Sequence, residues 1–218
     1  PRVGVDALVA PFVQFGYEPK DTYDFSEKKL SARYYEHHDE GLPKVFISEM
    51  RTAEFSPGLR DAVTGLVDKV SDNEIQAWDF PVSGRPWPVS YAVYEKLRSE
   101  SAYAGWLAAW GFRANHFTVL VNALKSNPSL EALSELLKDN GFALNSGGGE
   151  IKGSSDVFLK QSSTLASEIS VQFTDGTYTI PGCYYEFARR YPMSDGRLFQ
   201  GFVTRSADRI FESTDKRS

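Results

Sequence analysis

Two side chains that can bind a metal ion lie in separate stretches of alternating aromatic and β-branched residues. His116 opens the run 116–121, and Glu186 lies near the end of an aromatic run that begins at Gly182. A histidine and a carboxylate supply two of the three ligands of the 2-His-1-carboxylate face, which binds Fe(II) in oxygenases and leaves coordination positions open for substrate and O₂. The pair indicates a non-haem metal site if the two runs form neighbouring strands.

Each of these residues also has an ordinary structural interpretation. A lone histidine in a strand is often a hydrogen-bonded core residue rather than a metal ligand. A carboxylate among tyrosine and phenylalanine neighbours is costly to bury without a partner. Glu186 therefore needs a metal ion, a position at the rim, or an ion pair with Arg189 or Arg190. From the residues alone these alternatives stay open.

Other candidates for chemistry are weaker. His37 and His38 are adjacent at the end of a predicted strand, so their side chains point to opposite faces and cannot easily share a metal ion. The glycine-rich run 145–150 lacks the lysine and Ser/Thr of a phosphate-binding loop, which favours a flexible loop or lid. The sequence contains no G-x-S-x-G nucleophile elbow, and its single cysteine, Cys183, has no histidine nearby in sequence. Serine or cysteine hydrolase chemistry therefore has no local support.

Helices and strands that would position these residues can be predicted from the periodicity of the apolar residues. Helical spacing predicts helices over 5–15, 57–70, 90–109 and 128–139, and alternation predicts strands over 22–25, 30–36, 44–50, 116–121, 143–145, 169–173 and 178–187. Asn127 is expected to cap the helix that begins at Pro128. Asp175-Gly176 is expected to form a hairpin turn.

The order of the elements nearly repeats between the two halves of the chain. The first half is α-β-β-β, as though a leading strand were missing, and the second is β-α-β-β-β. We expect an α+β fold in a single domain, with a first half at 1–78, a connector and helix at 79–112, and a second half at 113–218. Two βαβββ-like modules with curved mixed sheets around a central metal site, plus extra helices, would match the vicinal-oxygen-chelate, or glyoxalase-like, enzymes; at this point the match is an analogy of fold alone.

Composition narrows the classes of function. The chain has 218 residues, of which 41% are hydrophobic and 24% charged, as in an ordinary soluble globular protein. The net charge of −5 gives no general attraction to nucleic acid or to an anionic membrane. No apolar run approaches the roughly 18 residues that span a bilayer. A single cysteine excludes an internal disulfide and favours a reducing cytoplasm.

Five segments together resemble the 2-oxoadipate dioxygenase/decarboxylase family, whose members are also called hydroxyglutarate synthases. The segments are Asn115-His116-Phe117-Thr118, Gly149-Glu150-Ile151-Lys152-Gly153, Gln161-Ser162-Ser163-Thr164, Ile180-Pro181-Gly182-Cys183-Tyr184-Tyr185-Glu186-Phe187 and Ser206-Ala207-Asp208-Arg209-Ile210-Phe211. The likeness covers most of the chain and is strongest to the short bacterial members.

This resemblance implies a vicinal-oxygen-chelate-like fold and a non-haem Fe(II), or another divalent metal, held by two histidines and one glutamate. His116 matches the second histidine ligand and Glu186 the glutamate. Ser206 matches a serine near the substrate, and Gln161 and Tyr184 are further candidates for substrate binding. The first histidine of the family lies in an H-x-A-x-R segment that has no counterpart here, and it is expected upstream of Pro1.

The implied reaction combines O₂ with a 2-oxo acid, 2-oxoadipate at the level of the family, to give CO₂ and a 2-hydroxy acid such as 2-hydroxyglutarate. One alternative is a metal-dependent hydrolase or glyoxalase-like isomerase on the same scaffold, and another is a non-catalytic interaction protein. Turnover without O₂ consumption would favour the former. The expected partners are the 2-oxo acid and O₂, without nucleic acid or membrane, and assembly into a homodimer is left open.

Overall fold

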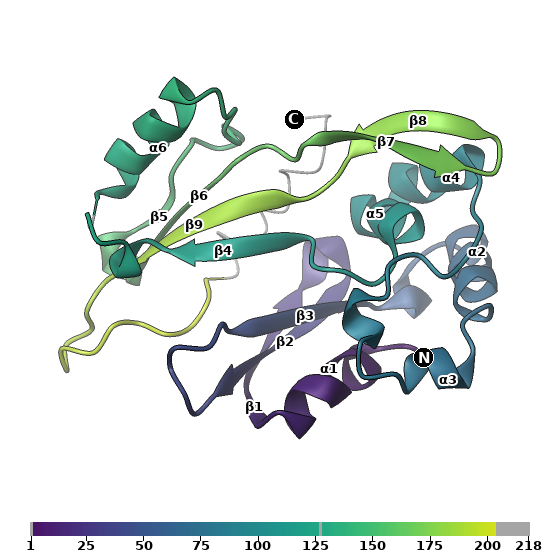
Figure 1. The fold of residues 1–218 in the computed structure, drawn as a ribbon, viewed down its shortest axis with the longest axis horizontal. Helices are drawn as coiled ribbons and strands as arrows, with labels where there is room; N and C mark the ends of the chain where they lie inside the picture. Colours follow the sequence, from purple (N-terminus) through teal and green to yellow (C-terminus); the bar gives the residue numbers. More distant parts are fainter. Residues whose placement is uncertain (1, 127, 204–218) are drawn as a thin grey trace. The chain divides into compact units, whose positions relative to one another are not determined.

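The computed structural model describes residues 2–126 and 128–203, and the chain groups into two compact units (Figure 1). Unit 1 comprises Pro1–Ala114 with Ser170–Thr179, and unit 2 comprises Asn115–Ile169 with the chain from Ile180 onward. Both units combine helices with strands, which confirms the α+β class. The expected division into halves at 1–78 and 113–218 stays a prediction. Within the described part of the chain, none of the helices has the length and apolar character needed to cross a membrane.

Unit 1 contains a three-stranded antiparallel sheet in the order β1 (Tyr17–Phe25), β2 (Leu30–His37), β3 (Val45–Met50). Helix α1 (Val5–Gln14) covers one face of this sheet, because its Val5 and Val9 pack against the tyrosines of β1 and β2 (Figure 1). All three predicted strands are present. Strand β1 begins five residues earlier than predicted, since residues 18–22 are exposed and gave no alternation to recognise.

The remaining helices of unit 1 are α2 (Pro57–Val67), α3 (Asp72–Ile75), α4 (Tyr91–Glu100) and α5 (Ala102–Trp110). Helix α2 begins as predicted, with Pro57 in its first turn and Ser56 as the cap. The single helix predicted over 90–109 is wrong. It is interrupted at Ser101, whose extended backbone ends α4 and whose side chain accepts a hydrogen bond from the Ala104 N–H to cap α5.

Unit 2 is built on a four-stranded mixed sheet in the order β4 (His116–Leu120), β9 (Tyr184–Arg190), β6 (Leu159–Ser163), β5 (Lys152–Ser154). Strands β4 and β9 are parallel, and the other two pairs are antiparallel. Helix α6 (Leu130–Asp139) packs its leucines against Val121 and Phe187 and covers one face of this sheet (Figure 1).

Three local predictions in unit 2 need correction. Helix α6 is capped by Ser129, whose side chain accepts from the Ala132 N–H, so Pro128 precedes the helix; Asn127 lies outside the described residues. Residues 143–145 form no strand but a single bridge between Leu144 and Thr164. Strands β5 and β6 were not predicted, because β6 is largely buried although four of its five residues are polar.

The last predicted strand, over 178–187, is two strands. Strand β8 (Gly176–Pro181) pairs with β7 (Glu168–Phe173), and a hairpin turn at Thr174-Asp175 joins them, one residue before the expected Asp175-Gly176. Gly182 and Cys183 separate β8 from β9. A Cβ atom at Gly182 would lie 2.6 Å from the end of the Ile169 side chain, which would have to move to accommodate it.

Candidate metal centre

Strands β4 and β9 bring His116 and Glu186 together on one face of the unit 2 sheet. The parallel register pairs Thr118 with Glu186 and His116 with Tyr184, so these side chains point to the same side. The imidazole Nε2 of His116 lies 3.5 Å from the carboxylate Oε2 of Glu186. A nitrogen and an oxygen donor are therefore adjacent and are held by rigid elements.

Neighbouring side chains fix the orientation of both groups. The Nδ1 of His116 lies 3.2 Å from Oδ1 of Asn115, and a proton on Nδ1 that is donated to this carbonyl leaves the Nε2 lone pair on the side of Glu186. The imidazole ring stacks on the ring of Tyr184, with centroids 4.8 Å apart. On the other side, Nε2 of Gln161 donates a hydrogen bond of 2.5 Å to Oε1 of Glu186.

Burial shifts the titration of both groups. Burial lowers the pKa of His116 to about 4, so its imidazole is neutral at neutral pH, which is the form that binds metals. Burial also raises the pKa of Glu186 to about 7, although the hydrogen bond from Gln161 and the charge of Arg190 oppose the shift. A buried carboxylate in this condition is stabilised by an added cation.

The sequence left open an ion pair between Glu186 and Arg189 or Arg190, and the structure supports this alternative only in part. Arg189 donates to the carbonyl of Pro128, and Arg190 donates to the carbonyls of Phe199 and Gly201. Arg190 is close enough to lower the pKa of the Glu186 carboxyl group, and the imidazole that lies beside this carboxylate is the neutral side chain of His116.

This donor set fits a divalent metal. A neutral imidazole and a carboxylate, side by side and mostly buried, are two ligands of the type found in non-haem iron sites. Within residues 2–126 and 128–203, no group of three or more histidine, cysteine, aspartate or glutamate side chains is placed to hold a metal ion. The third ligand therefore stays a prediction.

Comparison with known proteins decides the family. The sequence model of the 2-oxoadipate dioxygenase/decarboxylase family matches residues 79–199, more than half of the chain. The chain belongs to this family. The solved hydroxyglutarate synthase of Oryza sativa, in complex with 2-oxoadipate, is 32% identical, with a TM-score of 0.90 over 99% of this chain and 77% of that one.

Three further proteins are similar to this chain. A solved protein of Shewanella frigidimarina NCIMB 400, provisionally named a hydrolase, is 49% identical, with a TM-score of 0.90 over 93% of this chain and 80% of that one. A chloroplastic 2-oxoadipate dioxygenase/decarboxylase of Arabidopsis thaliana is 33% identical over 97% of this chain, which spans 64% of the plant protein's length. A glyoxalase superfamily protein of Ralstonia eutropha JMP134 shares the fold at 23% identity, with a TM-score of 0.71 over 91% of this chain and 67% of that one. The expected glyoxalase-like fold is confirmed.

The structure of this family member places two of the three predicted substrate-binding residues beside the metal pair. Gln161 contacts Glu186 and Tyr184 contacts His116, whereas Ser206 lies outside the described residues. Two buried polar atoms here, Oε1 of Gln161 and the hydroxyl of Tyr184, have no hydrogen-bond partner among the residues that the structure describes. They could accept or donate to a bound group.

Sequence reasoning missed Asn115 as a functional neighbour of the centre. It had one available signal, because Asn115 directly precedes His116 in the segment that resembles the family. The expectation that His37 and His38 point to opposite faces is wrong, because β2 ends at His37 and the two rings lie 4.0 Å apart. Nδ1 of His37 accepts a hydrogen bond from the Asp39 N–H. No metal role is assigned to them.

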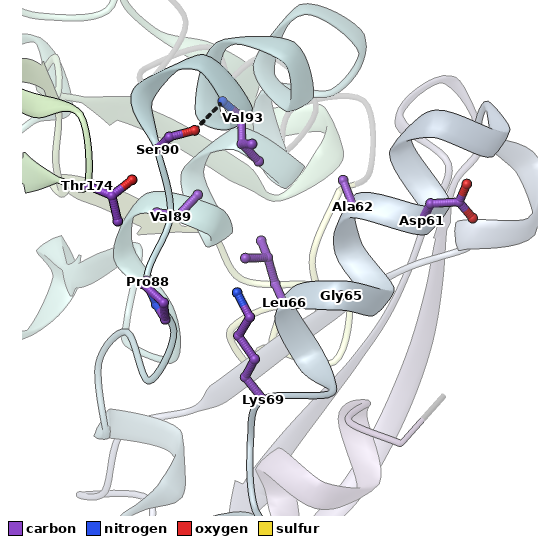
Figure 2. Close-up of a pocket in the computed structure, with 10 residues that line it drawn as sticks. All are labelled: Asp61, Ala62, Gly65, Leu66, Lys69, Pro88, Val89, Ser90, Val93 and Thr174. Atoms are coloured by element: carbon purple, nitrogen blue, oxygen red, sulfur yellow. Dashed lines mark hydrogen bonds between the residues drawn. The ribbon is translucent and has the colours of Figure 1, made fainter.

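Unit 1 contains a separate groove of about 440 Å³ (Figure 2). Figure 2 shows it between α2 and the segment that leads into α4, with Leu66, Val89 and Val93 on its walls and the carboxylate of Asp61 directed away from them. Its lining includes no histidine and only this one carboxylate. The candidate centre therefore depends on the buried His116–Glu186 pair and not on this cavity.

Proposed function

We propose that the protein is an Fe(II)-dependent dioxygenase that oxidatively decarboxylates a 2-oxo acid, with 2-oxoadipate as the first candidate. The observation that carries the proposal is the 3.5 Å approach of the His116 Nε2 to the Glu186 Oε2 on a buried sheet face of a chain in this family. The substrate follows from the family and from the rice relative in complex with 2-oxoadipate.

His116 and Glu186 would hold the iron, together with a second histidine that the family resemblance implies. When bound, Fe(II) supplies the activation of O₂ and a site at which a 2-oxo acid can chelate through its keto and carboxylate oxygens. The neutral His116 donates a lone pair without adding charge, and the carboxylate of Glu186 offsets one positive charge of the metal. Asn115 and Gln161 hold the two donor groups in place.

The atoms of the proposed reaction balance. The bond between C1 and C2 of the 2-oxo acid breaks, and C1 leaves as CO₂. One atom of O₂ joins C2, which becomes the carboxyl carbon of the product, and the other forms the hydroxyl group on C3. The product is a 2-hydroxy acid one carbon shorter than the substrate, 2-hydroxyglutarate in the case of 2-oxoadipate.

The chain's own contribution is to bind, orient and shield the reacting groups. Glu186 is only 5% exposed and Tyr184 only 3%, so one side of the centre is closed to bulk water. The side chain of His116 is 25% exposed, which leaves an approach from its side. The hydroxyl of Tyr184 and Oε1 of Gln161, which have no hydrogen-bond partner among the described residues, are placed to meet polar groups of a substrate.

The test is oxygen uptake by the full-length protein, loaded anaerobically with Fe(II), on addition of 2-oxoadipate, with shorter 2-oxo acids in parallel. Uptake matched by CO₂ and by a hydroxy acid supports the proposal and ranks the substrates. His116→Ala is expected to abolish uptake, and His38→Ala is the matched control because His38 has no role at the centre.

Two results would redirect the proposal. Turnover of a substrate without O₂ consumption, in protein that contains metal, would favour the hydrolase or isomerase alternative. Full-length protein that binds no divalent metal would favour a non-catalytic interaction protein. Cytoplasmic localisation and homodimer formation remain predictions from the sequence.

A further inference from the structure

Gln161 makes the shortest polar contact at the centre. Its Nε2 lies 2.5 Å from Oε1 of Glu186, and its side chain is 3% exposed. The antiparallel register between β6 and β9 pairs Gln161 with Ala188 and Ser163 with Glu186, so Gln161 and Glu186 project from the same face. The contact therefore joins two buried side chains on adjacent, hydrogen-bonded strands.

This contact separates the roles of the two carboxylate oxygens. Gln161 occupies Oε1, while Oε2 is the oxygen that lies 3.5 Å from Nε2 of His116. The terminal torsion of a glutamate side chain is broad, so an unrestrained carboxylate would rotate and exchange its oxygens. A hydrogen bond between buried groups on rigid strands removes this freedom.

The chemistry of an amide suits this task better than that of a cation. A lysine or arginine at the same place would neutralise the carboxylate and compete with a metal ion. The amide of Gln161 donates a hydrogen bond and adds no charge, so the negative charge of Glu186 remains available.

We propose that Gln161 is a positioning residue of the metal centre, which holds Glu186 by Oε1 so that Oε2 faces the metal beside His116. This proposal rests on the proposed function. In this role the amide nitrogen of Gln161 contacts the carboxylate of Glu186. Oε1 of Gln161, which has no partner among the described residues, is then left to accept a hydrogen bond from a substrate or water.

The test compares metal binding by the full-length wild-type protein and two variants, with Co(II) as a spectroscopic substitute for Fe(II). Gln161→Met removes the donor at similar volume, and Gln161→Asn keeps the amide but shortens its reach. Both are expected to weaken binding of Fe(II) and Co(II) by about 10- to 100-fold, as is typical when a partner of a metal ligand is lost. At saturating Co(II), the d–d absorption bands should change because the carboxylate orientation has changed.

Ser162→Ala is the matched control. Ser162 is the next residue on β6, is fully buried, and points to the opposite face because it pairs with Phe187. It should alter neither the affinity nor the Co(II) spectrum. Far-UV circular dichroism and the unfolding midpoint of each metal-free variant report whether the fold is retained.

Each outcome of these measurements either supports or overturns the positioning role of Gln161. Weaker binding together with an altered spectrum in folded Gln161 variants supports the proposal. Wild-type affinity and spectrum in Gln161→Met would overturn it while leaving the proposed function intact. Weaker binding with an unchanged spectrum, or an equal loss in Ser162→Ala, would also overturn it, because the effect would then be general to the strand. Absence of metal binding by the wild-type protein would overturn both.

Discussion

Replacing Glu186 by glutamine should stabilise the metal-free protein while it abolishes metal binding. Burial raises the pKa of Glu186 to about 7 from an ordinary 4.5, which means that the folded state disfavours the ionised form. The difference of about 2.5 pH units corresponds to about 3 kcal/mol of unfolding free energy, at about 1.4 kcal/mol per unit. A glutamine has nearly the same shape, carries no charge, and can still accept the hydrogen bond from Gln161.

The sign of the pH dependence follows from the raised pKa. In the wild-type protein the unfavourable ionisation begins to act above the unfolded value of 4.5 and is complete above about 7. The advantage of Glu186→Gln should therefore be about 3 kcal/mol near pH 8 and should shrink toward zero below about pH 4.5.

Urea unfolding of the chelator-treated proteins at several pH values measures this difference. A divalent metal at 1,000 times its Kd should then reverse the order, since it adds about 4.1 kcal/mol to the protein that binds it, which exceeds the advantage of about 3 kcal/mol of the variant. Equal stabilities of the two proteins near pH 8, or a difference that does not vary with pH, would refute the reasoning that ionisation of the buried Glu186 destabilises the metal-free protein.

Three further predictions concern other parts of the chain. His116→Ala should retain the fold but lose bound iron, measured by metal analysis; retained iron would contradict its assignment as a ligand. Asp175→Ala should lower the urea midpoint, because this carboxylate accepts the Tyr91 N–H at 2.6 Å and caps α4. The hydrogen bonds lower the pKa of Asp175, so the deficit should be present at neutral pH and disappear as the pH falls below the ordinary value of 3.8. Gly111→Ala should lower unfolding free energy by about 3 kcal/mol, since its φ is 68° and a Cβ would lie 2.1 Å from a carbonyl oxygen; Gly65→Ala, in an open position on α2, is the control and should raise it by about 1 kcal/mol.

The sequence allowed His116 and Glu186 to be located on predicted strands, but it did not predict that these two strands pair. Alternation around His116 and the aromatic run before Glu186 each predicted a strand, because β-branched and aromatic residues suit a pleated surface. The parallel pairing of β4 with β9 joins residues about 70 positions apart in the chain. Local periodicity contains no information on which strands pair, so the 3.5 Å approach could be hypothesised and not predicted.

The spacing of apolar residues also could not predict where one helix ends and the next begins. The run over 90–109 has apolar residues at helical spacing throughout, and serine is only mildly unfavourable inside a helix. Ser101 nevertheless ends one helix and caps the next, because its side chain satisfies a free backbone N–H of α5. The same residue type therefore fits a helix interior and a helix start, and tertiary packing selects between them.

Strand β6 was not predicted because its sequence departs from the hydrophobic pattern of a buried strand, and this departure has a functional reason. Residues 159–163 read Leu-Lys-Gln-Ser-Ser, which lacks the apolar alternation of a buried strand, yet Gln161, Ser162 and Ser163 are all at most 3% exposed. A buried polar run is expensive unless its groups find partners, and here Gln161 finds the carboxylate of Glu186. A strand that served only packing would replace this glutamine with an apolar residue. A buried polar residue within a core strand therefore indicates a functional site. Gln161 is such a residue, and its replacement should weaken metal binding while the protein still folds.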